Sequence, residues 1–144
     1  MRPAPELFAR ARAAMDKAYA PYSRFHVGCA IRGAGGKLYS GANVENAAYP
    51  QGWCAEASAI AAMIADGERG IAEILVVGAR RGEAGDYLPD PKALCTPCGG
   101  CRQKINEFAD ATTLVHVCGP EGVRKSFTFG ELLPAAFGPR NLAP

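Results

Sequence analysis

The stretches WCAEASAIAAM at residues 53–63 and PCGGCRQ at residues 97–103 decide how this sequence folds. Each of them places a cysteine where a helix is expected to begin. The first predicts a helix over residues 54–65 that is apolar on nearly all sides, which we expect to be buried. In the second, Pro97 favours a helix start because its missing N–H is not needed in the first turn. Two helices, over 54–65 and 98–108, are therefore expected to frame a cysteine-bearing site.

The pattern on either side of these helices predicts an α/β fold. Apolar residues recur at helical spacing before Pro21, alternate around the turn at Gly35-Gly36, and form short β-rich runs later in the chain. The other expected elements are a helix over 5–19, a β-hairpin over 25–43, strands over 71–79, 112–118 and 123–129, a loop over 80–94 and a helical turn over 131–133. Strands separated by single helices imply a mixed sheet with helices packed on it. A chain of 144 residues suits one domain, residues 1–144.

Composition argues against several classes of protein. The net charge is only +2, from 16 Lys and Arg against 14 Asp and Glu, and no dense basic cluster appears. We therefore expect no nucleic-acid partner, since tracking phosphates needs a stripe of positive charge. The first residues lack the apolar core of a signal peptide, and no run reaches the length of a membrane span. The sequence predicts a cytoplasmic protein with no membrane partner.

The six cysteines suggest metal chemistry. Without a secretion signal, a disulfide framework is not expected. Cys98 and Cys101 are three residues apart at a helix start, so both sulfurs can share one face, and the helix N-terminus favours their thiolates. Cys54 begins the other helix. Three such ligands leave a fourth position open, which is typical of a catalytic Zn²⁺ site.

Glu56 gives this metal site a possible chemistry. It follows Cys54 by two residues, so its carboxylate lies beside the metal without having to bind it. Zinc brings the pKa of its bound water toward neutrality, and a nearby glutamate can take that proton and pass it on. A Cys-x-Glu segment followed by Pro-Cys-x-x-Cys is the order found in zinc deaminases.

Each motif alone has a simpler interpretation. A single Cys-x-x-Cys is more often a structural zinc site or a redox pair. Cys95, Cys98 and Cys101 are also evenly spaced and could mimic part of an iron–sulfur motif. That alternative lacks a matching fourth cysteine and gives Glu56 no task. Cys29 and Cys118 fall on expected strands, where a small buried thiol is the usual state.

At these residues the sequence resembles the homotetrameric cytidine deaminases, and the similarity runs from about Phe8 to Phe137. The matching stretches are APYSRFHVG at 20–28, GANVENAAY at 41–49, CAE at 54–56, PCGGCRQ at 97–103 and ELLP at 131–134. The resemblance implies a three-layer α/β/α sandwich with a mixed five-stranded sheet. It also implies a homotetramer with shared active sites, in which cytidine and deoxycytidine are hydrolysed to uridine and deoxyuridine with release of ammonia, a reaction of pyrimidine salvage.

The resemblance also implies roles for individual residues. The pair Asn43 and Glu45 would bind the ribose hydroxyls, which agrees with the donors and acceptors that these side chains offer. Taken alone, Asn43 could merely shape a turn, and Phe25 and Phe137 could be ordinary core residues. The full set of expected site residues comprises the ligands Cys54, Cys98 and Cys101, the catalytic Glu56, and the substrate-binding Phe25, Asn43, Glu45, Ala55, Glu56 and Phe137, the last reaching a neighbouring subunit.

One position departs from the family pattern. Many members with three cysteine ligands carry an arginine directly after the catalytic glutamate, where it offsets the ligand charge, but this chain has Ala57. Three thiolates around one Zn²⁺ leave a net charge of minus one, so another positive field must compensate. The helix N-termini and Arg102 are the candidates. His26 and His116 have no ligand spacing with the cysteines, and we interpret them as structural.

Three rival functions remain at this point. The same scaffold could deaminate a related nucleoside analogue such as blasticidin S. A polynucleotide deaminase is disfavoured because the chain lacks the basic and aromatic surface that single strands require. The protein could also be a non-catalytic zinc-binding module, which would bind zinc but release no ammonia from a cytosine nucleoside.

Overall fold

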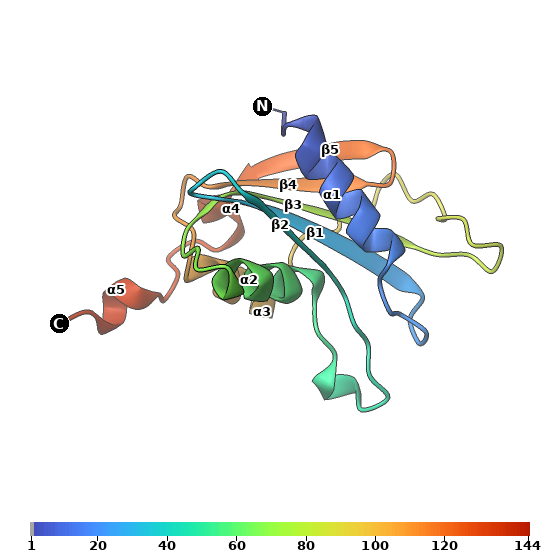
Figure 1. Cartoon of the computed structure of the whole chain (residues 1–144), viewed down its shortest axis with the longest axis horizontal. Helices are drawn as coiled ribbons and strands as arrows, with labels where there is room; N and C mark the ends of the chain where they lie inside the picture. Colours follow the sequence, from blue (N-terminus) through green and yellow to red (C-terminus); the bar gives the residue numbers. More distant parts are fainter. Residues whose placement is uncertain (1) are drawn as a thin grey trace.

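A single mixed sheet of five strands organises the computed structural model, which describes residues 2–144. The strand order is β2-β1-β3-β4-β5, and only β3 and β4 run parallel to each other. This confirms the predicted mixed five-stranded sheet (Figure 1). The strands are β1 (Phe25–Gly33), β2 (Leu38–Ala42), β3 (Ile71–Arg80), β4 (Leu114–Gly119) and β5 (Gly122–Thr128).

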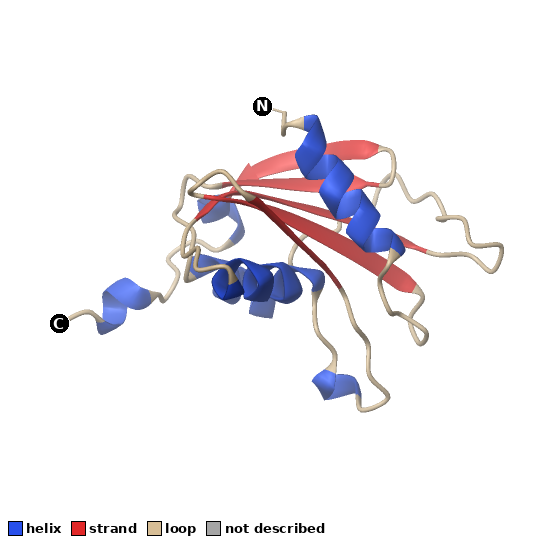
Figure 2. Ribbon diagram, viewed as in Figure 1, coloured by secondary structure: helices blue, strands red, loops and turns tan. Residues whose placement is uncertain are grey.

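Helices cover both faces of this sheet and produce the expected three layers. One face is covered by α1 (Pro5–Asp16), and the other by α2 (Ala55–Ala65) and α3 (Gly99–Asn106), as Figure 2 shows. Each face has its own apolar core, the larger one lying under α2 and α3. The short elements are η1 (Tyr49–Gln51), α4 (Phe129–Leu132) and α5 (Pro139–Leu142).

Two glycines let the helices approach the sheet closely. A Cβ atom at Gly28 on β1 would collide with the backbone of α1 at Ala11. A Cβ atom at Gly41 on β2 would lie 2.5 Å from the backbone nitrogen of Ala59 on α2. Such contacts exclude any larger residue, so these glycines set the distance of both helical layers from the sheet.

The first helix is shorter than predicted. It ends at Asp16, whereas the sequence pattern continued to Tyr19. Tyr19 instead forms a parallel bridge with Val44, and its N–H donates to the carbonyl of Asn43 at 3.0 Å. A tertiary backbone contact has replaced the last helical turn, which local periodicity cannot reveal. The helix α5 and the single turn η1 were not predicted, since both begin within proline-bearing loops.

The expectation that the helix over 54–65 is buried on all sides is wrong for this chain. The face of α2 toward the sheet is buried at Ala59 and Met63, but Ala61, Ala62 and Ala65 are exposed. An apolar helix normally avoids water on every side. The outer face of α2 is therefore an apolar surface that the chain by itself leaves uncovered.

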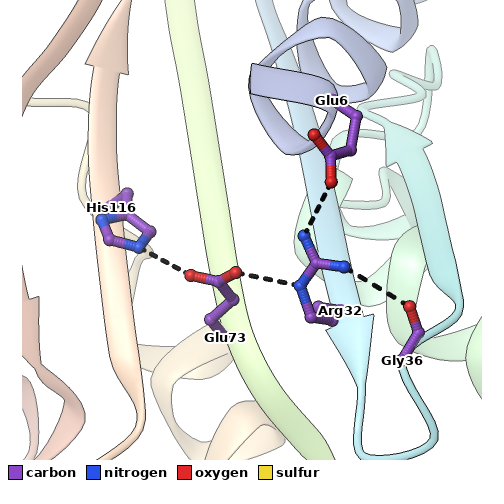
Figure 3. A network of polar contacts seen from close by, with 5 residues as sticks. All are labelled: Glu6, Arg32, Gly36, Glu73 and His116. Carbon is purple, nitrogen blue, oxygen red and sulfur yellow. Dashed lines mark hydrogen bonds and ion pairs between the residues drawn. The ribbon is translucent and has the colours of Figure 1, made fainter. Parts of the chain in front are cut away.

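A chain of polar side chains crosses the sheet between the strands (Figure 3). The fully buried His116 on β4 contacts Glu73 on β3 through Nε2 at 3.0 Å and Ser126 on β5 through Nδ1 at 2.7 Å. Glu73 accepts a hydrogen bond of 3.0 Å from Arg32 on β1, whose guanidinium lies 3.5 Å from Glu6 of α1. Both ring nitrogens of His116 are thus used within the fold, in agreement with a structural role.

Within residues 2–144, none of the helices combines the length and the apolar character that crossing a membrane requires.

Candidate active site

Three cysteine sulfurs meet where α2 and α3 begin. Cys54 is the N-cap of α2, Cys98 is the N-cap of α3, and the buried Cys101 lies in the first turn of α3. The three Sγ atoms lie within 4.8 Å of one another, and those of Cys54 and Cys98 are 3.9 Å apart. Tetrahedral zinc with Zn–S bonds of about 2.3 Å would separate its sulfurs by about 3.8 Å. The cluster therefore fits a zinc ion.

The surroundings of the cluster favour thiolate at Cys54. A hydrogen bond from the Cys101 thiol, aided by one from Cys98, lowers the pKa of Cys54 to about 6, although burial acts in the opposite direction. The same hydrogen bond raises the pKa of Cys101 above its usual range. The N-termini of two helices point their free N–H groups toward this negative charge. A sulfur anion suited to binding a cation is thus present at neutral pH.

Glu56 is a buried carboxylate beside this cluster. It lies in the first turn of α2 and is only 5% exposed. Burial raises its pKa to about 7, and the neighbouring Cys54 thiolate acts in the same direction. A carboxyl group with this pKa can both accept and return a proton near neutral pH.

A cavity of about 370 Å³ brings most of the predicted site residues together. Of the three predicted metal ligands, Cys54 and Cys98 line it, while Cys101 is buried. Glu56 therefore faces the same space as the residues expected to hold a nucleoside. The predicted substrate-binding residues on its wall are Phe25, Asn43, Glu45, Ala55 and Glu56.

Phe137 does not reach this cavity within its own chain. It is 59% exposed, and its carbonyl accepts hydrogen bonds from Gln103 and Asn106 of α3. In Figure 1 the C-terminal segment that carries α5 projects away from the sheet. A role for Phe137 in a binding site therefore requires the cavity of another copy of the chain.

Cys95 stays outside the metal cluster. Within residues 2–144, the cysteines that come together are Cys54, Cys98 and Cys101 alone, so the even spacing of Cys95 does not produce an iron–sulfur site. Cys95 lines the cavity, and burial raises its pKa to about 12. Its sulfur occupies the space that a side chain at Gly78 would need.

Several residues of the cavity wall were missed by sequence reasoning. Tyr49 and Trp53 line it, and Trp53 is 66% exposed although it is the only tryptophan of the chain. The signal available in the sequence was the single tryptophan directly before a ligand cysteine. Ser23 belongs to a stretch that resembled the family, but it received no role, because its contact with Glu45 joins two distant loops.

Arg102, expected to offset the ligand charge, donates hydrogen bonds to two backbone carbonyls. Its Nε donates to the carbonyl of Pro97 and its Nη1 to that of Leu132, both at 2.8 Å. It thereby fixes the loop before α3 to the end of α4. The charge of Lys104 also contributes, as the smallest of several causes, to lowering the pKa values of Cys54 and Glu56.

Comparison with known proteins agrees with this geometry. The family model for the cytidine and deoxycytidylate deaminase zinc-binding region matches residues 1–117. The chain belongs to this family. A cytidine deaminase of Sporosarcina psychrophila is 35% identical over 138 residues, which cover 96% of this chain and 93% of the relative.

Solved cytidine deaminase structures share the fold. The crystal structure of the Burkholderia pseudomallei cytidine deaminase is 39% identical with a TM-score of 0.77, over 92% of this chain and 97% of that one. The cytidine deaminase of Mycobacterium tuberculosis is 34% identical with a TM-score of 0.71, over 92% and 95% of the two chains. The predicted α/β/α deaminase sandwich is thus confirmed, and the family has a zinc-binding region.

Proposed function

We propose that the protein hydrolyses cytidine and deoxycytidine to uridine and deoxyuridine with release of ammonia, as part of pyrimidine salvage. The observation that carries this proposal is the buried Glu56 carboxylate beside the three sulfurs, in a cavity large enough for a small molecule. The relatives that match over most of this chain carry the name cytidine deaminase.

Cys54, Cys98 and Cys101 would hold the zinc ion. When bound, Zn²⁺ would supply Lewis-acid activation of water. The chain itself contributes the proton transfers: Glu56 takes a proton from the attacking water and donates it to N3 of the pyrimidine ring, then takes the remaining proton from the hydroxyl formed at C4 and delivers it to the amine, which leaves as ammonia while the C4 carbonyl forms. A pKa of about 7 suits a group that must be deprotonated at the start of each cycle and protonated midway through it.

Asn43 and Glu45 would bind the sugar, and Phe25 and Ala55 would contact the base. Asn43 is locked onto β1, since its Oδ1 accepts from the N–H of Val27 at 2.9 Å and its Nδ2 donates to the carbonyl of Phe25 at 2.8 Å. It retains one N–H for a ligand. This rigid placement supports a binding role, because a preorganised donor loses little entropy when the substrate arrives.

The proposed assembly is a homotetramer with shared active sites, in which Phe137 contacts the base bound by a neighbouring subunit. Three exposed apolar features support it: the outer face of α2, the side chain of Phe137, and the aromatic residues Tyr49 and Trp53 at the cavity mouth. Apolar surfaces of this kind mark protein interfaces. We also propose that residues 1–144 form one domain and act in the cytoplasm.

An ultraviolet assay of cytidine loss tests the proposed reaction. Wild type and Glu56→Ala are compared at equal zinc content, together with turnover of blasticidin S. We expect the variant to keep its zinc and to lose at least about 100-fold in rate, because general acid–base catalysis contributes factors of this size. Equal activity of both proteins, or faster turnover of the antibiotic than of cytidine, would overturn the proposal.

A further inference from the structure

We propose that Ser23 is a positioning residue, whose hydroxyl fixes the carboxylate of Glu45 so that it can accept a hydrogen bond from a sugar hydroxyl. The inference rests on the proposed function, in which Glu45 binds the sugar of a nucleoside. Ser23 and Glu45 are 22 residues apart in the sequence and meet where the loop after α1 passes the loop after β2.

Most acceptor positions of the Glu45 carboxylate are occupied by donors from the turn that contains Ser23. Its Oε1 accepts the backbone N–H groups of Tyr22 at 3.0 Å and of Ser23 at 3.1 Å. Its Oε2 accepts the Ser23 hydroxyl. A carboxylate offers about four acceptor positions. Three are therefore taken by the protein, and one acceptor position, on Oε2, is left for a ligand.

The direction of the Ser23 hydroxyl is also fixed. Its oxygen accepts a hydrogen bond of 3.0 Å from the N–H of Phe25, so its own proton is free to point at Glu45. Two consecutive hydrogen bonds thus run in one direction, from the N–H of Phe25 to the hydroxyl of Ser23 and from that hydroxyl to the carboxylate of Glu45. A hydroxyl held at both ends cannot rotate to serve another partner.

This series of hydrogen bonds connects the proposed sugar site to the proposed base site. The N–H of Phe25 is held through Ser23, and its carbonyl accepts from the amide of Asn43 at 2.8 Å. Both backbone polar groups of the residue proposed to contact the base are therefore bonded to residues of the sugar site. Phe25 is also paired with Arg80 in the ladder between β1 and β3, so its position does not depend on Ser23 alone.

The turn that carries Ser23 is anchored independently of Glu45. Arg24 has a positive φ of 60°, which is uncommon for a residue with a side chain. Its guanidinium donates to the carbonyls of Arg81 and Gly82 at 3.2 and 3.1 Å, and its N–H to that of Ala20 at 2.9 Å. The turn therefore keeps its shape when a single side chain is removed, so a Ser23 variant tests the hydroxyl rather than the loop.

The electrostatics of the carboxylate agree with this role. Burial acts to raise the pKa of Glu45, but the hydroxyl and backbone donors of Ser23 and Tyr22 outweigh it and keep the pKa below its usual range. An ionised carboxylate has no proton to donate. The sugar hydroxyl must therefore be the donor, and its partner is the single free position on Oε2.

Steady-state kinetics of Ser23→Ala, Ser23→Thr and Glu45→Ala, at equal zinc content, test this inference with two substrates. Cytidine carries the 2′ and 3′ hydroxyls, one of which would donate to Glu45, and 2′,3′-dideoxycytidine lacks both. We expect Ser23→Ala to raise the KM for cytidine about tenfold and to change kcat less than threefold, the size of one charge-assisted hydrogen bond. Ser23→Thr, which keeps the hydroxyl, should restore KM to within about threefold of wild type.

The second substrate separates positioning from general damage. For 2′,3′-dideoxycytidine, kcat/KM of Ser23→Ala should stay within about twofold of wild type, because no sugar hydroxyl then depends on Glu45. An equal loss with both substrates would overturn the positioning role. Unchanged cytidine kinetics in Ser23→Ala, beside a large KM increase in Glu45→Ala, would overturn it while leaving the proposed function intact. If Glu45→Ala also left cytidine kinetics unchanged, the proposed sugar site itself would be refuted.

Discussion

Nε2 of His116 lies 3.0 Å from Oε2 of Glu73, so a fully buried imidazole joins the two parallel strands of the sheet. Replacing His116 with alanine would leave a cavity and remove a hydrogen-bond partner from both Glu73 and Ser126. We expect the free energy of unfolding to fall by about 2–4 kcal/mol. Urea denaturation measures the change, and Lys92→Ala at an exposed residue is the control, expected within about 0.5 kcal/mol of wild type. Equal effects of the two variants would contradict the assigned role.

The raised pKa of Glu56 makes the stability of the metal-free protein depend on pH. Burial moves this pKa from 4.5 to about 7, so the folded state holds the proton more tightly than the unfolded state. The stabilisation is complete below pH 4.5 and is lost as the pH rises through 7. The advantage of Glu56→Gln over wild type should therefore widen by about 3 kcal/mol between pH 4.5 and pH 8. Denaturation curves at both pH values measure it, and a constant difference would show that Glu56 is not desolvated.

Two neighbouring cysteines should differ sharply in their effect on zinc content. Cys98 belongs to the sulfur cluster and Cys95 does not. We expect Cys98→Ala to lose most of its zinc, because one of three protein ligands is gone, while Cys95→Ala keeps one zinc per chain. Elemental analysis of the purified proteins measures both. Zinc loss in the Cys95 variant, or iron in the wild type, would argue for a different cluster.

The arginine that many members of the family carry after the catalytic glutamate can be introduced at Ala57. A guanidinium at position 57 would add positive charge near the sulfurs and favour the ionised form of every acid there. We expect Ala57→Arg to move the acidic limb of the pH–rate profile about 0.5–1 unit toward lower pH. Ala13→Arg, on an exposed position of α1 across the sheet, is the control for added charge. An unchanged profile would count against compensation of thiolate charge as a determinant of the rate.

Shared active sites can be detected by mixing inactive chains. Glu56→Ala lacks the proposed proton carrier, and Phe137→Ala lacks the aromatic ring proposed to enter a neighbour's site. Heteromers of the two variants would contain some sites with an intact Glu56 from one chain and an intact Phe137 from another. Co-expressed chains with distinct tags, purified as heteromers, should therefore exceed the summed activity of the separate variants. Purely additive activity would indicate that each chain completes its own site.

The strands, the two central helices and the metal cluster were predictable because their signals are local. Alternation fixed β1, and cysteines at two helix starts located the cluster, since a helix start defines both position and direction. Five of the six expected substrate-binding residues, all but Phe137, share one cavity, and they were expected from the resemblance to the family rather than from a local pattern.

What could not be predicted depends on contacts between distant residues. The end of α1 is set by the pairing of Tyr19 with Val44, and the direction of Glu45 is set by Ser23. Neither contact leaves a periodic pattern in the sequence. The exposure of the outer face of α2 was not predicted. A helix that is apolar on all sides is expected to be buried, but its sequence does not say whether the residues that bury it belong to the same chain.

Cys54 and Cys98 occupy the N-cap positions of α2 and α3, and neither makes a side-chain hydrogen bond to its helix. In most helices a serine, threonine, aspartate or asparagine closes this end by bonding to the first N–H groups. Here the residues at these positions belong instead to a sulfur cluster positioned to bind a metal ion. A zinc ion bound to these sulfurs would take the place of a helix cap, so the metal would add to the stability of the opening turn of α2, which also carries Glu56.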